Sequence, residues 1–199
     1  MTNRATDERG VTSQRILIDT AALFRRHGYE GTTTREISEA LGIKKASLYH
    51  HVSSKEDLLH QICLAALHDV DAGAKSAVAE AEDDPRARLR AMVHGHTLAM
   101  LANVDFSHTM LTDMRSLSGE RLEDVLQLRD SYERWTEELI RDAQAAHELR
   151  DDISSRYLTL ALFNLLNWTM FWYRPQGDLD ADGVAQLLTT MFLDGAIPR

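Results

Sequence analysis

The sequence predicts an all-α protein of about nine helices, and three observations support this fold class. Apolar residues recur at steps of three and four along most of the 199 residues, which is the helical period rather than the strand period. Glycine and proline number only 10 and 3 and fall in clusters. Residues that favour helix starts also stand at suitable places, such as Thr33 with Glu36 three residues later, and Asp84 directly before Pro85.

Further residues that favour helix ends indicate where the individual helices begin and stop. Gly28 and Gly42 follow the first two periodic segments and are suited to a left-handed helix end. Ser53 and Glu56 have the spacing of a capping box that opens a long fourth helix. The helices are expected over residues 12–27, 34–41, 45–52, 55–82, 85–103, 105–116, 119–148, 153–173 and 181–196.

The charge is unevenly distributed. The chain has 31 acidic and 22 basic side chains and a net charge of −9, which taken as a whole argues against a polyanionic partner. Residues 1–55 nevertheless carry a balance of +3, whereas residues 56–199 carry −12. Three of the four lysines, Lys44, Lys45 and Lys55, fall within twelve residues. A local cationic face on an acidic body is what a DNA-binding head requires, although the lysines could also be ordinary charges at a solvated helix end.

The compartment is expected to be cytoplasmic. The first twenty residues lack the apolar run of a secretory signal, and the lone Cys63 excludes an internal disulfide framework. The longest uncharged stretch, residues 157–173, is too short and too polar for a membrane span. We therefore expect no membrane association.

Two short helices joined by a glycine-containing turn, in the segment TTTREISEALGIKKASLYHHV, have the layout of a helix-turn-helix. Ile37, Ala40, Leu41, Ile43 and Leu48 are expected to point inward. Their burial would leave the polar residues of the second helix free to enter a DNA major groove.

At these residues the sequence resembles the TetR/AcrR family of bacterial transcriptional repressors. The motifs that carry the resemblance are FRRHGYEGTT, REISEALGIKKASLYHHV and SSKEDLL, in this order. The resemblance implies a helix-turn-helix DNA-binding domain of three helices over residues 11–55. It implies a ligand-binding and dimerisation domain over residues 56–199. The preceding residues 1–10 are polar and aperiodic, so a mobile arm is expected there.

The resemblance also implies which residues contact a double-stranded DNA operator. Two threonines and an arginine lie at the start of the second helix. Others lie at the start and on the exposed side of the recognition helix, and a lysine lies at the start of the fourth helix. These residues are Thr33, Thr34, Arg35, Lys44, Lys45, Ala46, Ser47, Tyr49, His50 and Lys55.

The second half of the chain holds residues suited to an effector. Six of the seven methionines and all three tryptophans lie beyond residue 90, where adaptable and rigid apolar side chains could line a cavity or could simply form core. The candidate ligand-binding residues are Met100, Phe106, Met110, Met114, Arg129, Trp135, Phe163, Asn167 and Trp168. No cofactor is expected.

The last two helices are too apolar to face solvent, so something is expected to cover them. The family resemblance implies that a homodimer interface does so. The stretch FNLLNWTMFWYRPQGDL further resembles TetR-family regulators that respond to acyl-coenzyme A thioesters and control fatty-acid or sterol breakdown. This resemblance implies that Arg129, Arg134 and Arg174 could meet coenzyme A phosphates, although pairing with nearby carboxylates explains them better.

Other functions have less support. The sequence lacks a G-x-S-x-G elbow, a Walker loop and a Gly-rich dinucleotide turn, so we expect no enzyme. His94 and His96 are two residues apart on a helix and cannot easily share a metal ion, which leaves an all-helical metal-dependent enzyme as a remote alternative.

The leading hypothesis is a dimeric repressor released by a small hydrophobic effector such as an acyl-CoA. The alternative is a regulator of an efflux or detoxification gene induced by drug-like or aromatic compounds.

Overall fold

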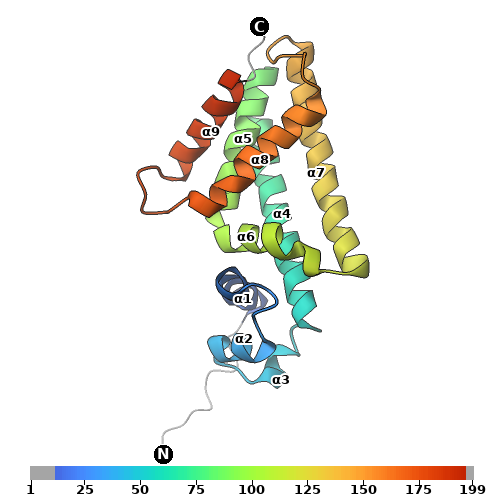
Figure 1. Ribbon diagram of the computed structural model, residues 1–199, viewed down its shortest axis with the longest axis vertical. Coiled ribbons are helices and arrows are strands. Elements are labelled where there is room, and N and C mark those ends of the chain that lie inside the picture. The colour runs from blue at the N-terminus through green and yellow to red at the C-terminus, as the bar shows by residue number, and fades with distance from the viewer. Residues whose placement is uncertain (1–11, 196–199) are drawn as a thin grey trace, which may run out of the picture. The chain divides into compact units, whose positions relative to one another are not determined.

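The structure is a computed structural model that describes residues 12–195, with side chains described to residue 193. This range is all-helical, as predicted, and the expected mobile arm over residues 1–10 lies outside it. Its helices are shown in Figure 1: α1 (Ser13–His27), α2 (Thr34–Leu41), α3 (Lys45–Leu48), α4 (Lys55–Glu80), α5 (Pro85–Ala102), α6 (Val104–Asp113), the short 3-10 helix η1 (Met114–Ser116), α7 (Gly119–Ala145), α8 (Ser155–Trp172) and α9 (Ala181–Gly195).

The chain packs as two compact units. The N-terminal unit holds residues up to Ala65 together with Asp105–Val125, and the C-terminal unit holds Ala66–Val104 and the residues from Leu126 onward. Helices α4 and α7 therefore give one end to each unit. The functional boundary expected after residue 55 does not follow this division of packing, and the assignment of functional domains stays a prediction.

Helix α1 contributes buried side chains to the N-terminal unit. Its start is capped by Thr12, whose hydroxyl accepts from the Arg15 N–H at 3.2 Å, and it ends at Gly28, where φ is 74°. Ile16 and Phe24, two full turns apart, are buried almost completely. One face of α1 is thereby fixed against the rest of the unit.

The start of α4 differs from the capping box expected between Ser53 and Glu56, and that prediction is wrong. The cap is Ser54, whose hydroxyl accepts from the Asp57 N–H at 3.0 Å. The Asp57 carboxylate in turn accepts from the Ser53 N–H at 2.8 Å. The motif is shifted because Lys55 is the first helical residue.

Two helix ends also lie earlier than expected. Helix α3 stops at Leu48 instead of residue 52. The N–H groups of His50 and His51 bond to carbonyls only three residues back, at 3.2 and 2.9 Å, so the α-helical bonding pattern is broken there. Helix α7 stops at Ala145 instead of residue 148, and His147 takes a left-handed φ of 60°. Every other end lies within two residues of its prediction, once η1 is counted with α6.

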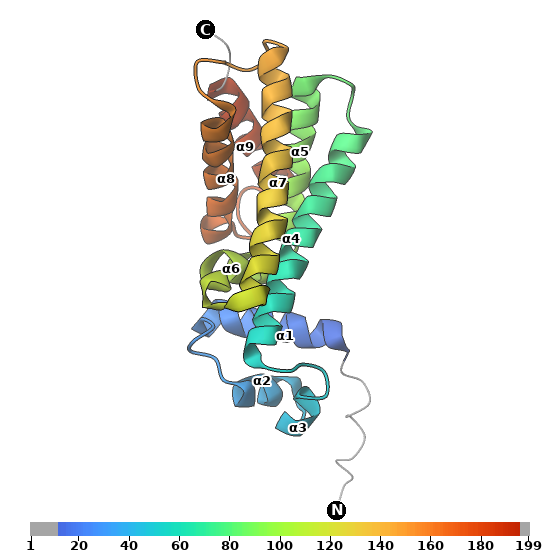
Figure 2. The same cartoon turned by 90° about the vertical axis from the view of Figure 1, so that its right-hand side faces the viewer.

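The C-terminal unit is built around α5, which lies beside α8 and α9 (Figure 1). Helices α4 and α5 run as neighbouring antiparallel helices (Figure 2). They cross closely at two glycines: a Cβ added at Gly95 would lie 2.5 Å from the Gly73 carbonyl oxygen. Asp84 and Pro85 open α5 as predicted, with the Asp84 carboxylate accepting from the Ala87 N–H at 2.7 Å. No helix in the described part is long and apolar enough to cross a membrane.

Candidate nucleic-acid interface and effector site

The turn between α2 and α3 is fixed by backbone bonds at a glycine. Gly42 adopts a left-handed conformation with φ 69° and ψ 22°, which an L side chain rarely adopts. The following N–H, of Ile43, reaches back to the Ser38 carbonyl at 3.0 Å. These bonds end α2 and turn the chain into α3, the arrangement of a helix-turn-helix.

The buried side of this motif matches the prediction fully at three positions of five. Ile37, Leu41 and Leu48 are buried and Ile43 is half-buried, but Ala40 is exposed, so the predicted inward orientation of Ala40 is wrong. Ser38 takes its place, because its hydroxyl donates to the Thr34 carbonyl at 2.8 Å and can therefore be buried. At about 100° per residue, Ala40 falls about 110° from the centre of the buried stripe.

The opposite side of α3 presents the predicted recognition residues. Lys45, the first residue of α3, makes a cation–π contact with Tyr49, which follows the helix: Lys45 Nζ lies 5.9 Å from the centroid of the Tyr49 ring. Ser47 is half-buried. The exposed positions in α3 and beside it are Lys44, Lys45, Ala46, Tyr49 and His50. Exposed cations, a phenol and an imidazole on a short helix and its flanking residues can contact phosphates and base edges together.

Two of the three predicted contacts at the start of α2 already bond to side chains within the helix. Thr33 and Glu36 form a capping box in which the Thr33 N–H and hydroxyl both donate to the Glu36 carboxylate, at 2.7 and 2.8 Å. These hydrogen bonds lower the pKa of Glu36. Arg35 Nε donates to Glu39 at 2.8 Å, and Thr34 is half-buried. Phosphate would have to compete with the carboxylates of Glu36 and Glu39 here.

Lys55 is the predicted contact whose surroundings differ most from a free surface lysine. Its ammonium donates to the backbone carbonyls of Tyr29 and Thr32, at 2.8 and 3.1 Å. Two of its three N–H groups are therefore used to hold the loop after α1. The predicted phosphate contact has one donor left to make it.

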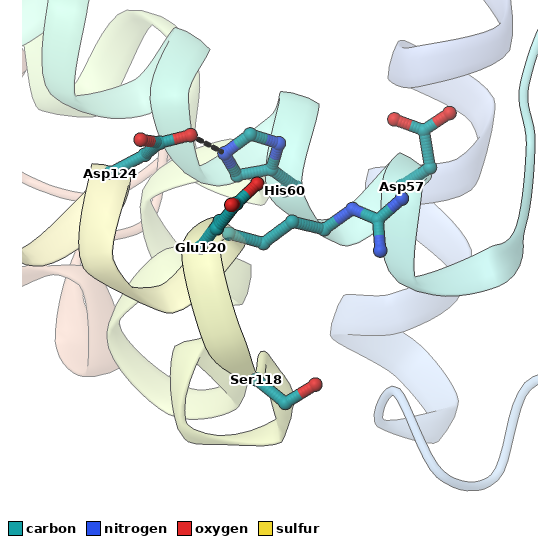
Figure 3. Close-up of a pocket in the computed structure, with 6 residues that line it drawn as sticks. Asp57, His60, Ser118, Glu120 and Asp124 are labelled. Carbon is teal, nitrogen blue, oxygen red and sulfur yellow. Dashed lines mark ion pairs between the residues drawn. The ribbon is translucent and has the colours of Figure 1, made fainter.

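A second contact within the N-terminal unit joins the starts of α4 and α7. The Ser118 N–H and hydroxyl donate to Glu56 at 2.9 and 2.8 Å, and Arg121 donates to the same carboxylate at 3.2 Å. Beside it lies an open pocket lined only by polar and charged side chains (Figure 3), in which His60 Nε2 approaches Asp124 to 3.3 Å. These contacts fix the first turn of α4, which directly follows the helix-turn-helix.

The predicted ligand residues Phe106, Met110 and Met114 also lie in the N-terminal unit, on α6 and η1. Met110 and Met114 are buried, and Phe106 is half-buried. Nearby, Arg25 of α1 donates to Asp105 of α6 at 2.7 Å. Ligand roles for these three residues stay predictions.

The C-terminal unit contains a buried polar group that the sequence interpretation missed. His96 is 3% exposed, and its Nδ1 lies 3.0 Å from the hydroxyl of the buried Tyr132. The rings of Phe163 and Trp135 close the cluster, with centroids 5.9 Å from His96 and 5.6 Å from Tyr132 respectively. The signal was present in the sequence, because His96 is one turn from Met100 and so lies on the apolar stripe of α5.

Burial decides the protonation of this cluster. It lowers the pKa of His96 to about 4, against a smaller opposing effect of the Asn167 side chain, so the imidazole is neutral at pH 7. Burial also raises the pKa of Tyr132. The structure thus brings three predicted ligand residues, Trp135, Phe163 and Asn167, around an uncharged histidine.

The other predicted ligand residues of this unit are placed differently. Met100 is buried in the same hydrophobic core. Trp168 is 65% exposed and stacks at a tilt on Phe171, with centroids 4.6 Å apart. Arg129 is exposed and pairs with the adjacent Asp130 at 3.0 Å. Ligand roles for these residues stay predictions.

Helices α8 and α9 present an exposed apolar face. Several residues expected to need cover, such as Leu162 and Leu188, are instead buried within the unit. Large apolar side chains that remain exposed on the two helices are Tyr157, Leu160, Trp168, Phe171, Trp172, Leu187 and Met191. Exposed apolar surface of this kind is typical of an interaction site.

Chemical groups for catalysis are sparse among the described residues. No three His, Cys, Asp or Glu side chains there are grouped to hold a metal ion. Cys63 is buried, which raises the pKa of its thiol to about 12. A thiol in that environment stays protonated and is a poor nucleophile.

Known proteins resemble both halves of the chain. Residues 16–62 match the family described as bacterial regulatory proteins, tetR family, and residues 82–196 match the tetracyclin repressor-like C-terminal domain. The HTH-type transcriptional repressor KstR2 of Rhodococcus jostii is 31% identical over 96% of this chain and 95% of its own length.

Two solved structures are similar in fold and sequence. The TetR family transcriptional regulator PfmR from Thermus thermophilus is 34% identical with a TM-score of 0.83, covering 90% of this chain and 97% of its own. AibR in complex with isovaleryl coenzyme A and operator DNA is 26% identical with a TM-score of 0.81, covering 90% of this chain and 96% of its own.

Proposed function

The chain belongs to the TetR family of bacterial transcriptional regulators, and on this premise we propose that it is a repressor that binds a palindromic operator as a homodimer and is released by a small hydrophobic effector. The observation that carries the proposal is the face of α3. Lys44, Lys45, Tyr49 and His50 are exposed on this helix and its flanking residues, while Leu48 is buried. This is the arrangement in which a recognition helix enters the major groove.

The charge distribution also supports an approach to DNA through the N-terminal residues. Residues 1–55 carry +3 and the remainder carries −12, so only the head attracts phosphate. The acidic remainder repels DNA and limits non-specific binding. The bacterial cytoplasm, where the chromosome lies, is the compartment that this function requires.

A homodimer is supported by the exposed apolar face of α8 and α9. Phe171, Trp172 and Met191 are each more than two-fifths exposed. A second copy of the chain would cover the same face on both protomers across a two-fold axis. That symmetry would match the two half-sites of a palindromic operator.

An acyl-CoA thioester is the effector class that we favour. AibR, which shares 26% identity, is described in complex with isovaleryl coenzyme A and operator DNA. The aromatic cluster of Tyr132, Trp135 and Phe163 offers apolar walls for an acyl group. Release requires that the effector prefers the conformation that does not bind DNA, typically by about 1–3 kcal/mol.

A gel-shift assay on the DNA that flanks the protein's own gene tests the proposal. We expect a specific, salt-sensitive complex that contains two protomers and dissociates when isovaleryl-CoA or octanoyl-CoA is added. Release by free aromatic compounds and not by thioesters would instead support the efflux or detoxification alternative. If no specific complex forms at low salt, the repressor proposal is wrong.

A further inference from the structure

A buried imidazole in the C-terminal unit has one ring nitrogen that no hydrogen bond uses. His96 Nδ1 is bonded to Tyr132, whereas Nε2 has no hydrogen-bond partner within the described part of the chain. The Asn167 side chain lies near enough to raise the pKa of the imidazole through hydrogen bonding, but its geometry does not satisfy Nε2 as a hydrogen-bond partner. The residue is 3% exposed, so bulk water does not compensate for the missing bond. Leaving such a group unpaired costs free energy, and native structures seldom do so without a functional reason.

The hydrogen bond to Tyr132 fixes which nitrogen carries the proton. A phenol is a stronger donor than a neutral imidazole, and an imidazole nitrogen is a stronger acceptor than a phenol oxygen. The Tyr132 hydroxyl therefore donates to Nδ1, and the imidazole proton is on Nε2. The unpaired group is a neutral N–H donor.

The surroundings of this donor are apolar and aromatic. Phe163 lies 5.9 Å from the imidazole and 5.7 Å from Tyr132, ring centroid to ring centroid. Trp135 lies on the far side of Tyr132, and Met100 is one helical turn further along α5 in the same core. These side chains suit the body of an apolar molecule whose polar atom reaches Nε2.

Charged groups near the cluster do not provide a site for an anion. Lys75 Nζ lies 5.7 Å from the Trp135 ring centroid, but its charge is paired with Asp71 at 2.7 Å. A neutral donor without a free cation beside it favours an uncharged acceptor, since a buried anion would be poorly compensated. A carbonyl oxygen is such an acceptor.

We propose that the Nε2–H of His96 donates a hydrogen bond to the carbonyl oxygen of the effector, whose apolar portion packs against Phe163 and Trp135. This inference rests on the proposed function, because it identifies the protein group that recognises the effector. Tyr132 acts as a positioning residue that holds the imidazole in the donating tautomer. For a thioester, the carbonyl oxygen would be the atom recognised, and the coenzyme A portion would lie outside this cluster.

Matched probes that differ only in the carbonyl oxygen test the hydrogen bond. Isovaleryl-CoA would be compared with its thioether S-(3-methylbutyl)-CoA, and octanoyl-CoA with S-octyl-CoA, by calorimetric titration of the full-length protein. We expect the wild type to bind at least one thioester about tenfold more tightly than its thioether. His96→Phe should abolish that preference, and His94→Phe should preserve it, because His94 is half-buried and bonded to Asp182 at 2.7 Å.

A spectroscopic measurement on the wild type keeps the test independent of the folding of any variant. With ¹⁵N-labelled histidine, we expect the thioester, and not the thioether, to shift the His96 Nε2–H resonance downfield and slow its exchange. Equal affinity for thioester and thioether, or an unchanged Nε2 resonance in the thioester complex, overturns the proposal.

Operator binding separates this inference from the proposed function. If none of the four probes binds while the specific gel shift persists, the carbonyl contact and the thioester effector are both wrong and the DNA-binding function stands. If the thioester preference depends on His96 but no operator complex forms, the inference holds and the repressor proposal fails.

Discussion

The ammonium of Lys55 lies 4.0 Å from the centroid of the Tyr29 ring and also donates to the backbone carbonyl of Tyr29 at 2.8 Å. Tyr29 belongs to the loop after α1, and Lys55 is the first residue of α4. One side chain therefore joins the core helix of the DNA-binding head to the helix that leaves it. Burial raises the pKa of Tyr29, which keeps its ring neutral and available to the cation.

We expect Lys55→Ala to lower the free energy of unfolding by about 1–2 kcal/mol, because it removes two hydrogen bonds and a cation–π contact. Urea unfolding at pH 7 measures this change. Lys45→Ala is the matched control, since Lys45 is exposed and should alter stability by less than about 0.5 kcal/mol. Equal stability of the two variants would contradict the structural role of Lys55.

We expect Gly95→Ala to destabilise the C-terminal unit by about 1–3 kcal/mol, because its Cβ would lie 2.5 Å from the Gly73 carbonyl oxygen and force α4 and α5 apart. Gly183→Ala in α9 is the control. Its Cβ would meet the flexible ends of Asp180 and Leu179, so the substitution should be neutral or stabilising. A thermal shift that is the same for both variants argues against the close helix crossing.

We expect Phe171→Glu to convert the homodimer to a monomer, because it places a charge on the exposed apolar face of α8. Sedimentation velocity reports the oligomeric state, and operator affinity should fall with it. Gln186→Glu, at an exposed polar position of α9, should remain dimeric. A Phe171→Glu variant that stays dimeric would place the interface elsewhere.

We expect the stability of the protein to depend on pH through His96. Its pKa is lowered from 6.5 to about 4 in the folded state, so the neutral form is the one that the fold favours. The contribution is fully present above pH 6.5 and is lost as pH falls toward 4, amounting to about 3 kcal/mol. Urea unfolding between pH 7 and pH 4 should therefore show a steeper loss for the wild type than for His96→Gln.

His94→Gln serves as the control for that experiment, since His94 is only half-buried and lies two residues away. It should retain the pH dependence of the wild type. If His96→Gln and the wild type lose stability in parallel, His96 is not held neutral by burial.

The sequence predicted most of the fold because its helix ends are encoded locally. The start of α2 follows from the Thr33 capping box and its end from Gly42, and the predicted first and last residues of this helix are both correct. The end of α7 was missed because His147, rather than a glycine, adopts the left-handed conformation there. Local signals cannot reveal a strained residue that the surrounding structure supports.

The candidate sites were predictable to a smaller degree. Exposure of the α3 face followed from the helical period, since Leu48 fixes which side is buried. The contacts of Lys55 with Tyr29 and Thr32 join residues more than twenty positions apart, so no local pattern indicated them. The pairing of His96 with Tyr132 spans 36 residues and depended equally on tertiary packing.

The salt dependence of operator affinity tests the central claim, that the exposed face of α3 binds DNA, most directly. Lys45→Ala should weaken operator binding and reduce the slope of log K against log salt by about 0.9, as expected for one lost phosphate contact. Lys75→Ala removes the same charge from the C-terminal unit, where Lys75 pairs with Asp71, and should keep the wild-type slope. Identical slopes for wild type, Lys45→Ala and Lys75→Ala would contradict the account.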